Sequence, residues 1–204
     1  VTQTTLCLAS LSHGQTLREA EFYFPLSHAS TQQLTAILYN HRKRINNLLN
    51  TDESPQYVSQ LVLPNIATLQ GMMHGFIDLI FEHNGKYYLC DYKSNHLGES
   101  YGDYGPDKLS QSIQKHHYDL QYLIYSVALQ RFLRQKLPNY SSEQHFGGVY
   151  YLYLRGMSSE SPNTGVYYCQ LTSEELTQLD NVFSNTLLDE KLESQKLEVI
   201  KGVK

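Results

Sequence analysis

Three residues, Asp78, Asp91 and Lys93, have the types and the spacing to do chemistry together. Two carboxylates side by side repel each other unless a cation neutralises them, and that cation is either Lys93 or a divalent metal ion. Mg²⁺ is the better candidate, because it prefers carboxylate oxygens and keeps several of its waters. The backbone carbonyl of Tyr92 is a further candidate oxygen ligand. The alternative is a strand pair with incidental charges and a salt bridge between Lys93 and Asp91.

A metal site of this composition suits the hydrolysis of phosphodiester bonds. A bound Mg²⁺ lowers the pKa of a coordinated water and stabilises negative charge on the phosphate. A lysine beside it can orient the attacking water or offset the charge that develops in the transition state. We therefore interpret Asp78, Asp91 and Lys93 as candidate catalytic residues, and Asp78, Asp91 and the Tyr92 carbonyl as candidate metal ligands.

A β-hairpin would bring these residues together. Two apolar segments flank Asn84-Gly85, which is the strongest short sequence signal for a two-residue turn. Pairing outward from this turn places Asp78 opposite Asp91 and Phe76 opposite Lys93, and facing Cβ atoms lie about 5 Å apart. Side chains alternate along a strand, so Asp91 and Lys93 share one face of the sheet.

The rest of the sequence predicts one domain in which strands and helices alternate. Ser30 and Gln33 have capping-box spacing before an apolar helical stripe, and Thr172 with Glu175 begins the last helix. Expected strands are 20–26 (ended by Pro25), 72–81, 86–93, 146–154 and 166–171, expected helices are 34–49, about 106–136 and about 172–192, and the segment 51–64 is rich in turn residues. The lead-in is 1–19, the core about 20–192 and the tail 193–204.

The long helix expected at 106–136 carries two stripes. Gln114, Tyr118, Gln121 and Tyr125 recur every three or four residues along one flank. Such a row suits a groove wall, where glutamine bonds a water or phosphate and tyrosine stacks on an unpaired base. Packing against the sheet is the alternative. The apolar stripe beside it consists of Leu109, Ile113, Leu120, Ile124 and Val127.

Any contact with nucleic acid must be local. The chain of 204 residues has a net charge of -4, whereas a general nucleic-acid coat protein is basic overall. The basic run His41–Arg44 is interpreted as a solvated helical face, with a contact to the DNA backbone as the alternative. Arg155, at a strand end, joins Gln114 and Tyr118 as a candidate DNA contact.

Composition excludes several classes of protein. Hydrophobic residues make up 41% and charged residues 18%, which is typical of a globular domain. No apolar run approaches the roughly 18 residues that span a bilayer, and the first ten residues do not form a signal peptide. No membrane association and a reduced, cytoplasmic setting are therefore expected. The three cysteines are too few and too far apart for a disulfide framework or an iron–sulfur cluster.

Several strings of this sequence resemble a known nuclease family. Gly75–Asp78 (GFID) and Asp91–Lys93 (DYK) resemble the two halves of the PD-(D/E)XK nuclease motif. Gln121–Tyr125 (QYLIY) resembles the Gln-x-x-x-Tyr motif of the RecB-like branch. The longer strings GFIDLIF, YYLCDYKSNHLGE, HYDLQYLIYSVAL and HFGGVYYLYLRG are similar, in this order, to RecB-type nuclease domains.

The resemblance implies a restriction-endonuclease-like α/β core, with a central mixed sheet flanked by helices. It implies Mg²⁺-dependent exodeoxyribonuclease activity within a helicase–nuclease that acts in double-strand break repair and homologous recombination. DNA, the RecC and RecD subunits and RecA are the partners it implies. It also assigns Gln121 and Tyr125 to the support of the site.

One departure concerns a histidine. The family has a metal-binding histidine on a helix upstream of the first acidic motif, and no such helix is expected before Ala20. By strand parity His74 lies on the site face of the hairpin, and it is either a substitute ligand or an ordinary strand histidine. We therefore expect an incomplete metal site and weak cleavage. The alternative function is a catalytically silent module that docks RecA, RecC or DNA.

Overall fold

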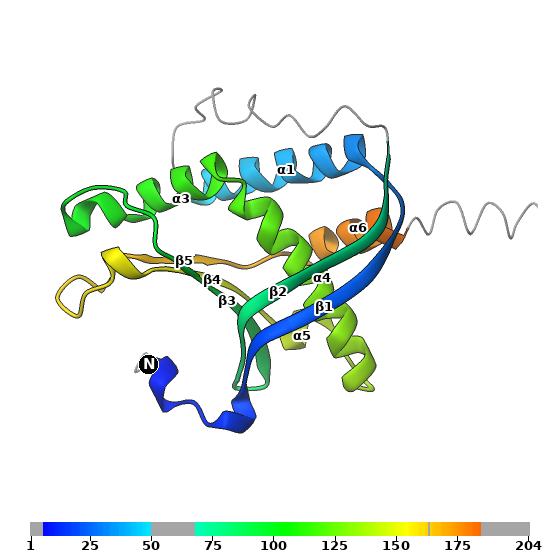
Figure 1. Cartoon of the computed structure of the whole chain (residues 1–204), viewed down its shortest axis with the longest axis horizontal. Helices are drawn as coiled ribbons and strands as arrows, with labels where there is room; N and C mark the ends of the chain where they lie inside the picture. The colour runs from blue at the N-terminus through cyan, green and yellow to red at the C-terminus, as the bar shows by residue number, and fades with distance from the viewer. Residues whose placement is uncertain (1–5, 50–67, 163, 185–204) are drawn as a thin grey trace, which may run out of the picture.

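One mixed five-stranded sheet organises the protein. The computed structural model describes residues 6–49, 68–162 and 164–184 (Figure 1). The strand order is β1-β2-β3-β4-β5, and every neighbouring pair is antiparallel except β3 and β4. The strands are β1 (Thr16–Ser30), β2 (Thr68–His83), β3 (Lys86–Lys93), β4 (Phe146–Tyr153) and β5 (Val166–Cys169). The predicted α/β class, with a central mixed sheet flanked by helices, is confirmed.

Helices cover one face of this sheet. They are α1 (Thr31–Leu49), α3 (Pro106–Lys115), α4 (Tyr118–Lys136), α5 (Ser142–His145) and α6 (Ser173–Ser184), with short 3-10 turns at Leu8–Ser10, His13–Gln15, Tyr101–Tyr104 and Leu154–Gly156. Because β3 and β4 are parallel, a crossover must join them, and α3 and α4 supply it. Among the described helices, none is both long enough and apolar enough to cross a membrane.

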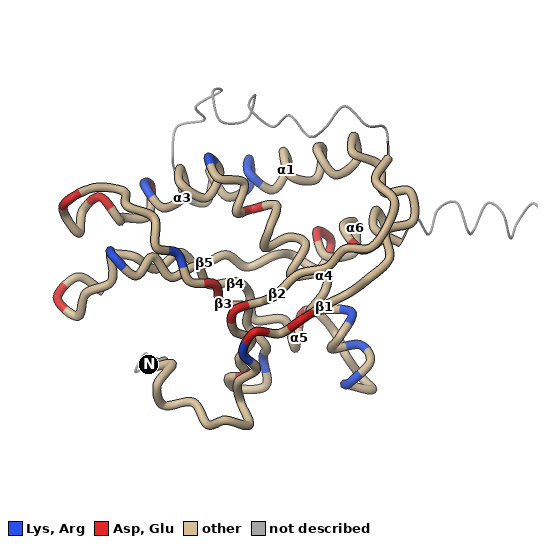
Figure 2. The backbone as a smooth tube through the Cα atoms, in the orientation of Figure 1, with Lys and Arg blue, Asp and Glu red and all other residues tan. Residues whose placement is uncertain are grey.

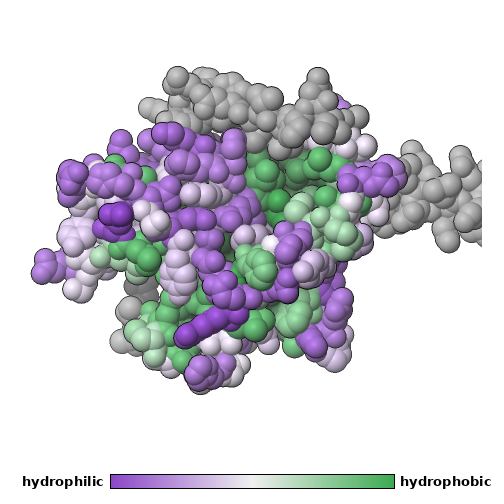
Figure 3. Space-filling model, in the orientation of Figure 1, coloured by the Kyte–Doolittle hydropathy of each residue, from purple (hydrophilic) through white to green (hydrophobic). Residues whose placement is uncertain are grey.

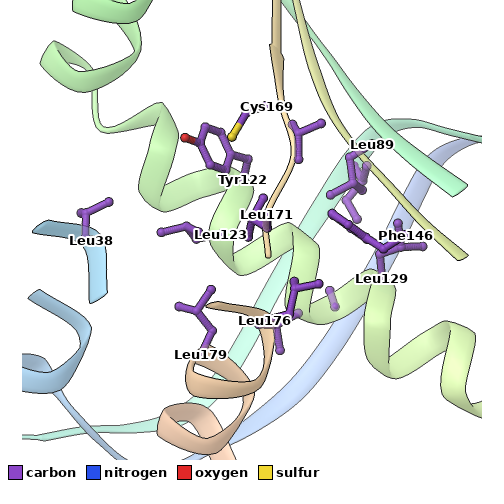
Figure 4. Close-up of a cluster of buried hydrophobic side chains, with 14 of the residues drawn as sticks. Leu38, Leu89, Tyr122, Leu123, Leu129, Phe146, Cys169, Leu171, Leu176 and Leu179 are labelled. Carbon is purple, nitrogen blue, oxygen red and sulfur yellow. The ribbon is translucent and has the colours of Figure 1, made fainter. Parts of the chain in front are cut away.

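Two apolar clusters hold these layers together. The larger one lies between the sheet and the helices, and Figure 4 shows Leu38, Leu123 and Leu179 of three different helices converging in it. The smaller one lies on the opposite face, where residues near the N-terminus, Leu6, Leu8 and Leu11, pack on the sheet. The sheet residues they cover are Leu79, Phe81, Cys90 and Leu152.

The hairpin between β2 and β3 has the predicted turn. Asn84 and Gly85 both have positive φ, 54° and 76°, as a two-residue type I′ turn requires. The pairing outward from the turn follows the predicted register as far as Leu79 and Cys90. The predicted pairs Asp78–Asp91 and Phe76–Lys93 are both absent from this ladder, because the two strands part beyond Leu79 and Cys90. β2 continues along β1 alone, and β3 continues along β4 alone.

The single helix predicted over 106–136 is two helices. His117 adopts the left-handed conformation, with φ 55°, and separates α3 from α4. Arg42 of α1 reaches this break: its Nη2 donates to the backbone carbonyl of Gln114 at 3.3 Å and to Asp119 Oδ1 at 2.9 Å. A cation thus satisfies a helix-terminal carbonyl. Helical periodicity in the sequence cannot predict a break that depends on such a tertiary contact.

The basic run His41–Arg44 is not a solvated face. His41 and Arg42 are 1% and 2% exposed, and both face other elements. His41 lies between Glu175 of α6 and Tyr122 of α4, with Nδ1 2.8 Å from Glu175 Oε1 and Nε2 2.6 Å from the Tyr122 hydroxyl. Only Lys43 is fully exposed, so the run joins α1 to two other helices.

The predicted ends of some helices and strands differ from those in the structure. Ser30 Oγ accepts the backbone N–H of Gln33, and Thr172 and Glu175 form a reciprocal capping box, as predicted. Pro25 does not end the first strand, because β1 is an edge strand and tolerates a residue without an N–H. The predicted segments 51–64 and 193–204, and the end of the last helix, lie outside the described residues.

We predict that the buried His41–Glu175 pair makes stability depend on pH in two windows. Burial alone would lower the pKa of His41, but the neighbouring Cys169 and Glu175 outweigh it and raise that pKa from 6.5 to about 9. Burial raises the pKa of Glu175, but His41 and Arg44 outweigh it and lower that pKa from 4.5 to about 2. The histidine's contribution is therefore complete below pH 6.5 and disappears as the pH rises through 9.

The contribution of Glu175 is complete above pH 4.5 and disappears as the pH falls through 2. Urea unfolding at a series of pH values measures both windows. His41→Gln should remove the alkaline dependence, which is on the order of 2–3 kcal/mol. The exposed His96 supplies the control substitution, His96→Gln. An alkaline dependence that persists in His41→Gln would contradict the assignment.

Candidate active site

The three predicted catalytic residues lie at the fork where β2 parts from β3. Asp78 is one residue beyond the last pair of the β2–β3 ladder, and Asp91 and Lys93 occupy the end of β3. The Asp78 carboxylate accepts the backbone N–H of Tyr92 at 2.9 Å and so spans the fork. The structure therefore brings Asp78 to the β3 segment that carries the other two residues.

Side-chain alternation along β2 is interrupted at Asp78. Ile77 and Ile80 both enter the core under the helices, whereas Leu79 packs on the opposite face. Asp78 and Glu19, which would face each other, are missing from a β1–β2 register that is otherwise regular between Thr16 and Leu26, and Glu19 has φ 49°. This irregularity frees Asp78 from a regular ladder position, and it reverses the parity of the residues before it.

His74 illustrates that reversal. Parity predicted it on the site face, but its ring stacks on Tyr23, and its Nε2 lies 3.0 Å from Glu21 Oε1. Ile77 and Met73, which alternate with it, belong to the core on the helix side. His74 therefore lies on the other face of the sheet, and the structure favours an ordinary strand histidine over a substitute metal ligand.

Asp91 and Lys93 form a buried ion pair. The Lys93 Nζ lies 3.1 Å from Oδ1 and 2.7 Å from Oδ2 of Asp91. Lys93 is 8% exposed and Asp91 is 5% exposed. Burial raises the pKa of Asp91, the neighbouring Lys93 opposes that rise, and the charge of Asp78 adds to it. The charge of Asp78 thus acts on the Asp91 carboxylate, and a shared cation would offset it.

Aromatic rings and an amide fix the ammonium group of Lys93. Its Nζ lies 4.0 Å from the ring centre of Tyr118 and 4.7 Å from that of Tyr151, within the range of cation–π attraction. It also donates to Gln121 Oε1 at 2.9 Å. A buried cation needs several such partners, because it has lost the water that solvated it.

Gln121 is itself held from both ends. Its Oε1 accepts the Tyr151 hydroxyl at 2.8 Å, and its Nε2 donates to the Tyr125 hydroxyl at 2.9 Å. The predicted supporting pair therefore contacts the site through Lys93. Tyr151 was missed by sequence reasoning, although it lies in a predicted strand. It becomes recognisable only from the parallel register, in which Tyr151 is the partner of Asp91.

The predicted DNA-contact residues separate into two groups. Tyr118 and Arg155 stay near the site: the Tyr118 hydroxyl donates to Asn95 Oδ1 at 3.3 Å, and Arg155 Nε donates to the Ser94 carbonyl at 2.9 Å. Gln114 does not, because the helix break takes it out of the stripe. Its amide is buried and donates to Asn46 Oδ1 at 2.8 Å, so it joins α3 to α1.

The apolar stripe of the long helix also differs from the prediction. Leu109, Ile113 and Val127 are fully buried, but Leu120 and Ile124 are only half-buried. On α4 the more deeply buried side chains are those of Tyr122 and Leu123, because the helical periodicity restarts after the break.

The donor set suits a hard divalent cation. Asp91 Oδ2 is buried, and no described group donates a hydrogen bond to it, although Lys93 lies close. Asp78 supplies the second carboxylate, and the carbonyl of Tyr92 remains a predicted third ligand. Among the described residues no group of three or more His, Cys, Asp or Glu side chains converges. A cation bound here would therefore complete its shell with water or substrate oxygens.

Fold and site together define a class. A mixed sheet flanked by helices, with paired acids and a lysine at the fork of a hairpin, is consistent with a restriction-endonuclease-like core. No family model matches the chain.

Individual relatives identify the family. The chain is 41% identical over 178 residues to the RecBCD enzyme subunit RecB of Haemophilus influenzae, an alignment that covers 87% of this chain and 14% of that protein. It is 38% identical over 188 residues to RecB of Escherichia coli, an alignment that covers 92% of this chain and 15% of that protein. RecB of Mycobacterium tuberculosis is 34% identical over 164 residues, and this alignment covers 74% of this chain and 14% of that protein. The chain is therefore a RecB homologue that matches one segment of that much longer subunit.

We predict that removing the positive charge of Lys93 destabilises the fold, because the buried Asp91 carboxylate loses its ion pair. Lys93→Met should lower the free energy of unfolding at pH 7 by about 3 kcal/mol, because it leaves Asp91 charged and unpaired. The loss should shrink in acid, where Asp91 becomes protonated. Adding Asp91→Asn should restore most of the stability, and Lys108→Met, at an exposed position of α3, is the control. Urea unfolding of the wild type, Lys93→Met, Asp91→Asn and the double variant measures the coupling, and additive effects would rule out a buried pair.

Proposed function

We propose that this chain is the nuclease domain of a RecBCD-type enzyme and hydrolyses DNA phosphodiester bonds with Mg²⁺. The observation that carries the proposal is the convergence of Asp78, Asp91 and Lys93 at the fork of β2 and β3. Similarity to RecB over most of the chain supports it. We further propose exodeoxyribonuclease action in double-strand break repair and recombination, with RecC, RecD and RecA as partners.

Each residue of the site has a role in this proposal. Asp78, Asp91 and the Tyr92 carbonyl would hold Mg²⁺, which supplies charge to polarise a phosphate and to acidify a water. Lys93 offers a fixed ammonium to a phosphate oxygen or to the attacking water. Gln121 and Tyr125 keep Lys93 in place and need no contact with DNA.

Contacts with the DNA backbone are local in this proposal. Lys and Arg residues lie in small groups, at the end of α4 and along α1 and α3, rather than over one continuous face (Figure 2). Hydrophilic residues dominate the visible surface around α3 (Figure 3). Tyr118 and Arg155, which adjoin Lys93 and the loop after it, are the proposed contacts. A catalytically silent docking module is the alternative, and activity measurements separate the two.

We predict that the chain degrades linear DNA when Mg²⁺ is present and that the acids are essential. Asp78→Asn and Asp91→Asn should each reduce the rate at least about a thousandfold, because both oxygen ligands act on one cation. Asn is close in shape to Asp, and circular dichroism verifies the fold. Glu160→Gln, on an exposed loop, is the matched control and should cut normally. Undiminished cutting by either Asn variant would remove that residue from the site.

We also predict weak Mg²⁺ binding in the absence of DNA. Two carboxylates and one carbonyl leave about half of an octahedral shell to water, and Mg²⁺ releases its waters reluctantly. Calorimetric titration should give a millimolar dissociation constant that Asp91→Asn weakens further. Micromolar binding, or binding unaffected by Asp91→Asn, would show that other groups hold the ion.

A further inference from the structure

Two side chains at one end of the sheet carry hydrogen-bond donors that no described group accepts. The parallel strands β3 and β4 end together at Lys93 and Tyr153, which are register partners, and the loops that follow them begin side by side (Figure 1). Asn95 and Arg155 each come two residues after the end of their strand. In α/β sheets, ligands bind outside the carboxyl ends of parallel strands, so a substrate is expected at this end.

The side-chain amide of Asn95 is held by its oxygen. Its Oδ1 accepts the Tyr118 hydroxyl at 3.3 Å, and the ring of the same tyrosine lies 4.0 Å from Lys93 Nζ. The Asn95 side chain therefore lies on the same side of the sheet as the ammonium group of Lys93. Because the oxygen is engaged, the Nδ2 group is left to donate elsewhere, and its two N–H donors have no partner among the described residues.

The guanidinium group of Arg155 is anchored at one of its three nitrogens. Its Nε donates to the backbone carbonyl of Ser94, the residue immediately before Asn95, at 2.9 Å. In the part of the chain that the structure describes, neither terminal nitrogen has a hydrogen-bond partner and no carboxylate pairs with this cation. An arginine anchored in this way presents a planar pair of donors that matches two oxygens of a phosphate.

Tyr104 keeps the loop after β3 in place. Its side chain is buried, and its hydroxyl accepts the backbone N–H of Leu97 at 3.2 Å and donates to the Asn95 carbonyl at 3.5 Å. The loop after β4 packs on the same ring, since a Cβ at Gly156 would lie only 2.2 Å from it. Both donor groups therefore project from backbone that is fixed before a ligand arrives, which lowers the entropic cost of binding.

We propose that Asn95 and Arg155 form a subsite for a DNA backbone phosphate close to the one that is cleaved, a proposal that rests on the nuclease function above. Unused N–H donors and a cation without a described carboxylate partner suit an anion, and the anionic groups of DNA are its phosphates. Asn95 is two residues from Lys93, at most about 7 Å along the chain, which is about two phosphate steps of one DNA strand. The subsite therefore positions the strand and reads no base sequence.

The experiment measures binding without cleavage. Fluorescence anisotropy in EDTA compares the affinity of the chain for an oligothymidine of about 20 nucleotides and for an abasic strand of the same length, which keeps the phosphates and lacks the bases. Asn95→Ala should weaken the binding of both strands about tenfold, because a hydrogen bond to a charged group is lost. Arg155→Met should do the same and reduce the slope of the salt dependence by about one.

Matched substitutions separate the subsite from general effects. Asn139→Ala, in the exposed turn after α4, and Lys43→Met, at an exposed position of α1, should change neither affinity. Asn95→Asp keeps the shape of the side chain and adds a negative charge, so it should weaken binding more than Asn95→Ala does. Thermal unfolding verifies that each variant folds.

A double-variant comparison tests the positioning role of the Tyr118 hydroxyl. Tyr118→Phe keeps the ring beside Lys93 and removes the hydroxyl that holds Asn95. It should weaken binding about threefold in the wild type and have no further effect in Asn95→Ala, because the hydroxyl acts through that amide. A further loss in the double variant would contradict this role.

Three results would overturn the proposal. They are wild-type affinity in Asn95→Ala or Asn95→Asp, an unchanged salt slope in Arg155→Met, and losses that appear with oligothymidine but not with the abasic strand. The last result would mean that these groups contact bases instead of phosphates. Failure of the nuclease function is distinguishable, because it appears as absent Mg²⁺-dependent cleavage by the wild-type chain, whatever the variants bind in EDTA.

Discussion

The buried ammonium group of Lys93 is the constraint on which this end of the structure depends. A cation out of water is costly unless several groups replace its hydration. Here one carboxylate comes from β3, an amide and a ring come from α4, and a second ring comes from β4. Those partners meet only if β3 and β4 pair in parallel register and α4 crosses them at one fixed height. The charge therefore ties the sheet to its covering helix at the site.

A second buried polar set fixes where α4 begins. Arg42 of α1 binds the last turn of α3 and the first turn of α4, so the chain can break its helix at His117. Tyr118, the first residue after the break, is also the residue whose ring lies nearest Lys93. His41, one residue before Arg42, is bonded to both α4 and α6. Neighbouring residues of α1 thus position the helix that supports the site.

Local chemistry explains what could be predicted from the sequence. The turn at Asn84-Gly85 and the caps at Ser30 and Thr172 depend on residues close together in the chain, so local sequence patterns predict them. The acids, the lysine and the pair Gln121 and Tyr125 came from spacing and from a family resemblance. The break at His117, the burial of His41 and Arg42 and the role of Tyr151 depend on tertiary contacts. Periodicity alone favoured a continuous helix and a solvated basic face, and it had no means of placing Tyr151.

The tight turn of the hairpin also makes chain length part of the site. Two residues join β2 to β3, and this count decides which side chains of β3 meet the helices. One inserted residue would exchange the two faces of β3 relative to β2, because alternation has a period of two. Cys90 and Tyr92 would then take the places of the acid and the lysine. A surface loop usually tolerates insertions, but an insertion here would displace the candidate site, so any natural length variation in this domain should fall elsewhere.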